Sequence, residues 1–380
     1  MKSVNTLDVY YQEKKVGTLA KAGKSNIAFS YDSNWLNTGF AISPFSLPLK
    51  EGVFIAEKPY FGGLYGVFGD SLPDSWGRLL VDCELKSKGI DPGELSQLDR
   101  LSIVGSTGKG ALTYKPNILE ENLYFDISDL DSVAEDAIEL IQHKDIENLD
   151  AIYFAGASSG GARPKINTEI DGTEWIIKFP ATVDQKEIGY IEKQYSDCAK
   201  KCGIPVPQTK LFSSKKCKGY FGSERFDRVK SGDEVKKIHM LTVAAILELD
   251  FTMPSLDYNS LMKLTKILTH DDEKQLKIMF KLMCYNVFAH NRDDHSKNFT
   301  FLYDEDNDSW FLSPAYDLTY SNTYFGEQTT SVNGKGNNIE MLDIISVGTN
   351  AGLSKKFCED EAEKIKAKAE KLIESIRKYL

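Results

Sequence analysis

The sequence predicts an α+β protein with a β-rich N-terminal part and a mainly helical C-terminal part. Three observations support this prediction. Residues 1–118 contain aromatic, β-prone runs such as "LDVYYQ" and "NIAFSY", bounded by Gly, Ser and Asn. Residues 151–230 alternate strand-like runs with turns. Residues 236–380 are dominated by segments with helical periodicity. We therefore expect three regions, with boundaries at 1–118, 119–235 and 236–380.

Composition and charge narrow the class of protein. The 380 residues are 41% apolar and 27% charged, which is ordinary for a soluble globular chain. A net charge of -10 argues against a large direct nucleic-acid surface but allows a basic partner that binds DNA. The chain has no apolar run near the length of about 18 residues that spans a membrane, and no signal-peptide pattern. We expect a cytoplasmic protein with six reduced, mostly buried cysteines.

The first region contains one clear helix. The stretch "SLPDSWGRLLVDCELKSKG" (71–89) has an apolar side, Asp74 or Ser75 as N-cap, and Gly89 as its end. The glycine-rich stretch "VGSTGKGALTY" (104–114) then leads into a strand. Residues 119–150 are acidic and are expected to be mostly helical.

The second region is predicted to contain a glycine-rich loop between strands. "DAIYFAG" (150–156) has the composition of a strand, and the loop "GASSGGARPK" follows it. "KINTEI" and "EWIIKF" are predicted strands joined by Asp171-Gly172, a strong hairpin signal. A helix is expected over 187–203, ended by Gly203, and "GYFGSERFDR" reads as a further strand.

A polar stretch in the third region predicts a site. The segment 273–291 has helical periodicity, and "NRDDHSKN" (291–298) follows it. Asp293 and Asn298 would lie about 140° apart on a helix and on opposite faces of a strand, so they converge only in an irregular loop. The strands "FTFLYD" and "WFLSPAYD" form a hairpin that returns Asp317 to this loop.

These residues suit phosphoryl transfer. Asn and Asp oxygens are hard ligands of the kind Mg²⁺ prefers. Protein kinases use one Asp to accept the proton of the attacking hydroxyl, with an Asn and a second Asp on the metal. Asp293 would be the base, and Asn298 and Asp317 the metal ligands. A calcium-type acidic loop, or turn residues that bond only their own backbone, are the alternatives.

Features upstream favour the kinase interpretation. The glycine loop allows close approach of backbone amides to anionic oxygens. Lys178, on a predicted strand between isoleucines and Phe-Pro, is suited to ATP phosphates, and an edge-strand charge is the alternative. Glu192 on the next helix is a candidate partner or a merely solvated residue, and "SERFDR" could hold adenine as a hinge. Their order predicts a protein-kinase-like bilobal fold with a β-rich N-terminal subdomain and a mainly helical C-terminal lobe.

The chain also resembles the HipA family of toxin–antitoxin serine/threonine kinases over nearly its whole length. In the N-terminal part the resemblance lies in "VGTLAKAGKSNIAFSYDSNWL", "ISPFSLPL", "LPDSWGRLL" and "VGSTGKGAL". In the kinase part it lies in "SSGGARPK", "IIKFP", "ERFDR", "NRDDHSKN" and "PAYDL", of which the last two at this separation are highly specific.

The resemblance implies roles for individual residues. It gives Asp293 as the catalytic base, Asn298 and Asp317 as magnesium ligands, and Lys178 as the lysine on the ATP phosphates. Further ATP-binding positions fall in the glycine loop, the hinge and the catalytic loop: Ser158, Ser159, Gly160, Gly161, Ala162, Glu224, Arg225, Phe226, His295 and Lys297. For His295 we expect a structural role in the loop. Autophosphorylation is implied at Ser158, with the adjacent Ser159 as the alternative.

The resemblance also implies a function. Such kinases use ATP and Mg²⁺ and phosphorylate a translation component, commonly an aminoacyl-tRNA synthetase. They are paired with a HipB-like helix-turn-helix antitoxin, through which they reach DNA indirectly. Two other classes stay open. One is a catalytically silent kinase-fold regulator that binds ATP and its antitoxin. The other is a phosphoester hydrolase with an acidic metal site, which would need further His or Asp ligands in a chain with only five histidines.

Overall fold

The structure is a computed structural model that describes residues 3–380 except 24–25, 119–128, 143, 145, 147–148, 158–159 and 233. The chain forms two compact units. The first unit comprises residues 1–184, 214–216 and 227–248, and the second comprises 185–213, 217–226 and 249–380. The three predicted region boundaries stay a prediction. In the part of the chain described, no helix is long and apolar enough to cross a membrane.

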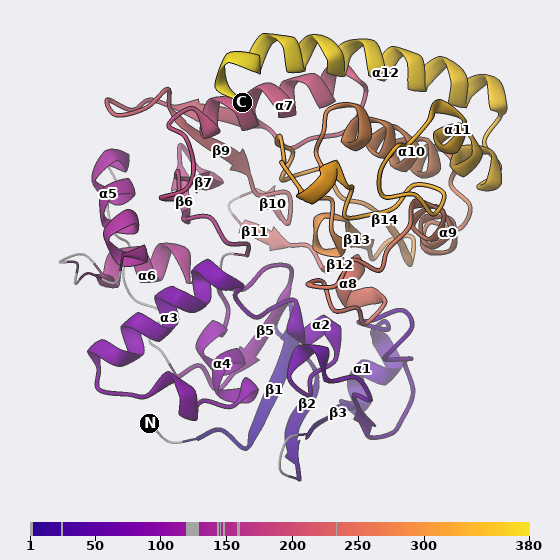
Figure 1. Cartoon of the computed structure of the whole chain (residues 1–380). Helices are drawn as coiled ribbons and strands as arrows, with labels where there is room; N and C mark the ends of the chain where they lie inside the picture. Colours follow the sequence, from indigo (N-terminus) through magenta and orange to yellow (C-terminus); the bar gives the residue numbers. More distant parts are fainter. Residues whose placement is uncertain are drawn as a thin grey trace. The chain divides into compact units, whose positions relative to one another are not determined.

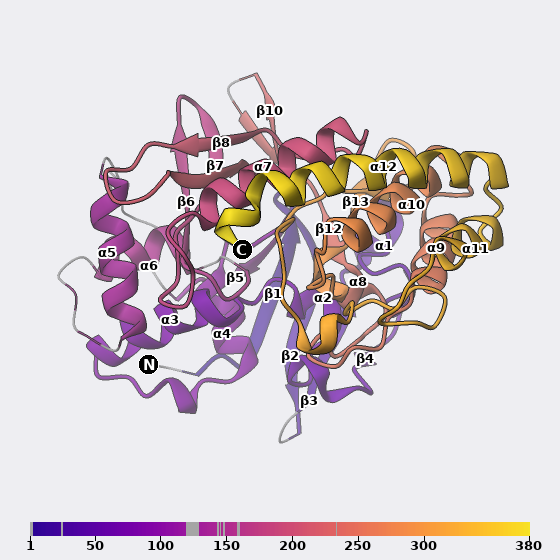
Figure 2. The same cartoon turned by 45° about the horizontal axis from the view of Figure 1, so that its top comes forward.

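The first unit contains an antiparallel sheet with strand order β4-β3-β2-β1-β5 (Figures 1 and 2). The strands are β1 (Thr6–Tyr11), β2 (Lys14–Ala22), β3 (Asn26–Tyr31), β4 (Phe54–Ile55) and β5 (Leu112–Lys115). In β1 and β3 every second residue is buried, as expected of strands with one face on the core. The predicted strands "LDVYYQ" and "NIAFSY" are thereby confirmed.

Helices pack around this sheet and beside it. α3 (Ser75–Ser87) begins after its N-cap Asp74, as predicted, and Gly89 follows it at a left-handed φ of 71°. The other helices of the unit are α1 (Ser33–Thr38), α2 (Gly66–Gly69), α4 (Gln97–Val104), α5 (Leu130–Ile141), α6 (Leu149–Gly156), α8 (Val243–Ile246) and the short 3-10 helices η1 (Pro59–Phe61) and η2 (Pro92–Glu94).

The predicted strand at 150–156 is wrong, because this segment is helix α6. It packs against α3, where Ile152 and Tyr153 join a core that includes Leu80. A short apolar run is compatible with either a buried strand or a buried helix, and only this packing decides between them. Of the acidic stretch 119–150, residues 130–141 are helical as expected, and 119–128 lie outside the described residues.

Two hairpins complete the first unit. β6 (Lys165–Ile170) and β7 (Thr173–Lys178) pair antiparallel around Asp171 and Gly172, whose φ angles of 52° and 70° suit the predicted tight turn. β10 (Arg228–Ser231) and β11 (Glu234–Lys237) form the second hairpin, and β12 (Met240–Thr242) follows.

The second unit is mainly helical. Its helices are α7 (Ile188–Lys201), α9 (Tyr258–Leu268), α10 (Glu273–Phe288), α11 (Met341–Asn350), α12 (Lys355–Ile376) and the 3-10 helices η3 (Ser296–Asn298), η4 (Tyr324–Gly326) and η5 (Arg377–Tyr379). α12 lies along α7 and α10 in both cartoon views (Figures 1 and 2).

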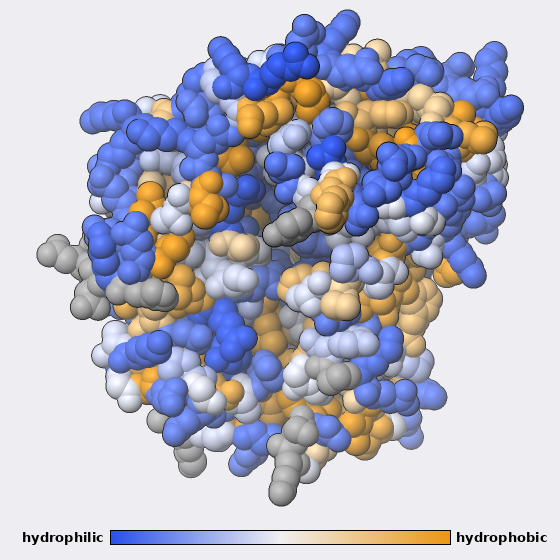
Figure 3. Space-filling view, viewed as in Figure 1, coloured by the Kyte–Doolittle hydropathy of each residue, from blue (hydrophilic) through white to orange (hydrophobic). Residues whose placement is uncertain are grey.

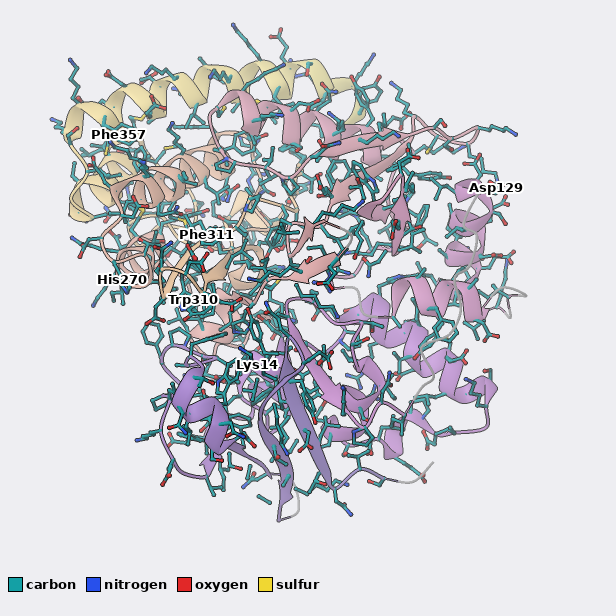
Figure 4. All side chains as sticks on the ribbon, turned by 180° about the vertical axis from the view of Figure 1, so that it is seen from behind. Lys14, Asp129, His270, Trp310, Phe311 and Phe357 are labelled. Carbon is teal, nitrogen blue, oxygen red and sulfur yellow. The ribbon has the colours of Figure 1, made fainter. Side chains whose placement is uncertain are left out.

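α12 is amphipathic. Its buried residues recur every three or four positions: Cys358, Ala362, Ile365, Ala369, Leu372 and Ile376. Hydrophilic residues cover its outward side in the space-filling view (Figure 3). Near its start, Phe357 packs on Phe280 of α10, with ring centroids 5.9 Å apart (Figure 4). α12 therefore closes one side of the helical core.

Two strand pairs belong to this unit. β8 (Thr209–Phe212) pairs with β9 (Tyr220–Glu224), and β13 (Thr300–Asp304) pairs with β14 (Ser309–Leu312). Trp310 of β14 packs on Tyr303 of β13 at 5.2 Å between ring centroids (Figure 4). The predicted returning strand over "WFLSPAYD" is too long, because β14 ends at Leu312 and Pro314, which has no N–H to donate, follows shortly after.

Candidate active site

The segment after α10 is an irregular loop, as the spacing of its polar residues predicts. Residues 291–295 have no regular structure, and η3 covers 296–298. The Asn298 side-chain amide donates to the Asp293 backbone carbonyl at 2.6 Å. This bond closes the loop and leaves the Asn298 amide oxygen as an acceptor. The Asp293 side chain is exposed.

The segment containing Asp317 lies against this loop. The Tyr316 hydroxyl bonds to the Lys297 carbonyl at 2.5 Å and to the Thr300 hydroxyl at 2.6 Å. Beyond Asp317, the Thr319 N–H donates to the Asn291 side-chain oxygen at 3.4 Å. Asp317 itself has a left-handed φ of 53°, a conformation that costs free energy in a residue with a Cβ. Bonds on both sides of Asp317 thus fix its backbone beside Asn298.

The two adjacent aspartates of the loop differ in environment. Asp294 is 1% exposed, unlike Asp293. Its carboxylate accepts from the Tyr258 hydroxyl at 2.7 Å, the Gln328 amide at 3.1 Å and the Thr330 N–H at 3.0 Å. Burial raises the pKa of Asp294 to about 7, and these donors oppose that rise. Asp294 is therefore an anchor of the loop.

Other buried polar groups hold the loop in place. The Asn286 amide donates to the Tyr258 hydroxyl and accepts from the Asn291 amide, both at 2.9 Å. Thr329 donates to the Arg292 carbonyl through its N–H at 2.9 Å and its hydroxyl at 2.8 Å. These supporting contacts could not be predicted from the sequence. The segment 328–331 ("QTTS") has no local pattern that indicates packing on a distant loop, and Thr330 lies 36 residues after its partner Asp294.

His295 and Lys297 are held locally. The His295 ring accepts the Lys297 N–H at 3.2 Å and so caps η3. Phe251 lies 6.0 Å from the His295 ring, and the Lys297 ammonium lies 4.1 Å from the Phe251 ring centroid. This is the kind of structural role expected for His295.

The predicted hinge, Glu224 to Phe226, begins at the last residue of β9. The Glu224 N–H donates to the Gln208 carbonyl at 2.9 Å, and Arg225 is 7% exposed. The Phe226 ring lies 5.6 Å from the ring of Tyr316, the residue before Asp317. The structure therefore brings the hinge segment to the segment that contains the proposed metal ligand.

The glycine loop belongs to the first unit and is bound to the start of α3. The Gly161 N–H donates to the Asp74 carboxylate at 3.1 Å, and its carbonyl accepts the Trp76 N–H at 3.2 Å. Lys165 donates to the Gly160 carbonyl. Gly161 has a φ of 82°, which favours glycine. Ala162 is exposed. Ser158 and Ser159 lie outside the described residues.

Lys178 and Glu192 are positioned within separate units. Lys178 is the half-buried last residue of β7, opposite Lys165 in the hairpin. Glu192 of α7 is 3% exposed, which is unusual for a carboxylate that is only solvated. The structure thus brings together Asp293, Asn298 and the Asp317 segment in the second unit. Gly160, Gly161 and Lys178 lie in the first.

Comparison with known proteins extends this description. The HipA N-terminal domain model matches residues 7–115, and the HipA-like C-terminal domain model matches residues 157–376. "Putative kinase Y4mE" of Sinorhizobium fredii is 24% identical, over 85% of this chain and 79% of that protein. A chain in the Shewanella oneidensis MR-1 complex of HipA, HipB and operator DNA superimposes with a TM-score of 0.72 at 18% identity, covering 98% of this chain and 91% of that one.

The fold is therefore of the α+β, kinase-like class that the sequence predicts. Because both domain models match, the chain belongs to the HipA family.

Proposed function

We propose that the chain is an ATP- and Mg²⁺-dependent serine/threonine protein kinase that acts as the toxin of a toxin–antitoxin module. One observation carries the proposal. The Asn298 amide donates to the Asp293 carbonyl, and the Tyr316 hydroxyl bonds the Asp317 segment to the same loop, so the segments that carry the candidate base and two hard oxygen ligands are bonded to one another. The name of the related Y4mE as a kinase supports it.

The proposed reaction transfers the γ-phosphoryl group in line to a Ser or Thr hydroxyl. ATP would supply the group and leave as ADP, and Mg²⁺ would supply positive charge that offsets the charge of the phosphates. Asp293, whose side chain is exposed, would orient the hydroxyl and accept its proton. Asn298 and Asp317 hold the metal, Lys178 and the glycine loop bind the phosphates, and Glu224 to Phe226 hold the adenine.

We infer two partners. The first is a HipB-like antitoxin, which the matched Shewanella complex of HipA, HipB and operator DNA supports and which we expect to be a helix-turn-helix protein. The second is a protein substrate from the translation machinery such as an aminoacyl-tRNA synthetase, which rests on the resemblance of the sequence motifs alone. The net charge of -10 suits DNA contact through that partner. Autophosphorylation on Ser158 of the glycine loop is part of the proposal.

The test is incubation with γ-labelled ATP and Mg²⁺, alone and with a bacterial lysate, with labelled residues identified by mass spectrometry. We expect label on the glycine loop or on a lysate protein with the wild type. Asp293→Ala should lower the rate by about 10²- to 10⁴-fold, the usual contribution of a positioned base. Asp306→Ala, an exposed carboxylate in the β13–β14 turn, should leave it unchanged.

Two outcomes would contradict the proposal. Equal labelling by the wild type and Asp293→Ala would remove Asp293 as the base. ATP binding without any transfer would favour the silent regulator instead.

A further inference from the structure

A surface loop after Asp317 begins and ends on the catalytic loop. At its start, the Ser321 N–H donates to the His290 carbonyl at 3.0 Å. At its end, Thr329 donates twice to the Arg292 carbonyl, at 2.9 and 2.8 Å. We call residues 322–327 the tip loop. Both ends of the tip loop are therefore bonded to residues 290–292, which immediately precede Asp293 in the chain.

The tip loop presents an exposed aromatic side chain. Phe325 is 91% exposed and has a left-handed φ of 55°. The base of the loop is closed by the Thr323 hydroxyl, which donates to the Glu327 carbonyl at 2.6 Å. A left-handed backbone is unfavourable for a residue with a bulky side chain. The fold therefore holds Phe325 in a costly conformation in which its ring faces solvent.

Exposure alone would not be informative, since single apolar residues are common on protein surfaces. In Phe325, however, exposure is combined with a strained backbone and with a loop that is bonded next to the proposed base, and this combination indicates a functional role. Strained residues persist where the surrounding structure over-determines them, and they concentrate at functional sites. Bonds at both ends of the tip loop provide that over-determination here.

We propose that Phe325 is a docking residue for the protein substrate. It contacts a large apolar side chain of the substrate, a few residues from the Ser or Thr that receives the phosphoryl group. Aromatic side chains are the residues that most often dominate such contacts, because they bury a large area with little conformational freedom to lose. This inference rests on the proposed kinase function and adds a determinant of substrate choice.

The test uses a variant that relieves the strain. Asn tolerates a left-handed φ, so Phe325→Asn should fold at least as stably as the wild type in urea unfolding, and Phe325→Gly provides a second such variant. Phe45→Asn, at an aromatic residue of the first unit that is 48% exposed, is the matched control. The probe is a peptide library with one fixed Ser, in which each flanking position is occupied in turn by each amino acid.

We expect the wild type and Phe45→Asn to select a large apolar residue at one flanking position. Phe325→Asn and Phe325→Gly should lose that selection, and transfer to the preferred peptides should fall by about tenfold, the loss expected for one interface anchor. Autophosphorylation and ATP affinity should stay at the wild-type level.

The outcomes separate the two proposals. The docking role would be overturned if the active wild type showed no preference for an apolar residue, or if Phe325→Asn and Phe325→Gly kept the wild-type preference. Neither result would contradict the proposed kinase activity. Absence of transfer by the wild type to itself, to lysate proteins and to peptides would overturn the kinase proposal, and the docking role with it.

Discussion

At the scale of single residues, the two neighbouring aspartates of the proposed catalytic loop differ in environment and in proposed role. Asp294 is buried under Tyr258, Gln328 and Thr330, whereas Asp293 is exposed. A buried carboxylate with several donors fixes backbone geometry but cannot reach a substrate hydroxyl. An exposed one can accept its proton.

The buried aspartate should make stability depend on pH. Burial raises the folded-state pKa of Asp294 to about 7 from an ordinary value of 3.8. Between those values the folded protein retains a proton that the unfolded chain releases. The stability contributed by this group is therefore fully present below about pH 4 and is lost as the pH rises through about 7, by about 4 kcal/mol at most.

Asp294→Asn should remove this slope. We expect its free energy of unfolding to lie below that of the wild type at pH 4.5, because the Asn amide group would face buried donors at a cost of about 1–3 kcal/mol. The difference in free energy of unfolding between the two proteins should be smaller at pH 7.5, because the wild type loses stability as the pH rises. Urea unfolding across this range measures it, with Asp293→Asn as the control for loss of a charge. If the free energies of unfolding of the wild type and Asp294→Asn changed with pH in parallel, the raised pKa of Asp294 would be contradicted.

Residue spacing predicts part of this site. The five-residue separation of Asp293 and Asn298 requires an irregular loop, and the loop is observed. The burial of Asp294 could not be predicted in this way. It depends on Tyr258 and Thr330, which reach the loop only through tertiary packing.

At the scale of elements, helix α3 is tied to the glycine loop. Its N-cap Asp74 makes no capping bond to its own helix and instead accepts the Gly161 N–H. The same carboxylate lies 3.8 Å from the Lys109 ammonium. The Trp76 backbone bonds to Gly161, and its indole donates to the Lys165 carbonyl at 2.8 Å. Residues of the N-terminal region thus set the position of the loop.

Loss of this tie should weaken ATP binding. Asp74→Ala removes a charge-assisted bond of about 1.5–3 kcal/mol, so we expect the KM for ATP to rise about tenfold or more with a smaller change in kcat. Asp74→Asn keeps an acceptor oxygen and should recover part of the loss. Asp82→Ala, on the same helix, is the control for general destabilisation. A lower KM in Asp74→Ala would mean that Asp74 competes with the phosphates.

An element whose residues restrict the local backbone conformation can be predicted from the sequence, whereas a short apolar element cannot. Asp171 and Gly172 demand left-handed backbone and specify the β6–β7 hairpin from two residues. In α6 the apolar residues have no clear period over so short a length. Its identity as a helix follows from the surface that α3 offers to Ile152 and Tyr153.

At the scale of the whole molecule, the proposed roles are divided between the units. Gly160, Gly161 and Lys178 belong to the first unit, whereas Asn298 and Asp317 belong to the second. The order of these motifs predicts the kinase-like fold, because few folds require a glycine loop, a strand lysine and a late Asp and Asn in that sequence. The boundaries of the compact units could not be predicted. Short segments of the chain, such as 214–216, return to the first unit through tertiary contacts alone.

The proposed roles of these residues predict how the chain responds to the nucleotide. ATP with Mg²⁺ at about 100 times its Kd should stabilise the folded chain by about 2.7 kcal/mol, measured as a rise in Tm. Lys178→Met and Asp317→Asn should each reduce that rise, although they lie in different units. Lys50→Met and Asp306→Asn, at exposed positions of the same two units, should keep it. If Lys178→Met kept the full rise in Tm while Asp317→Asn lost it, the second unit would bind the nucleotide without Lys178.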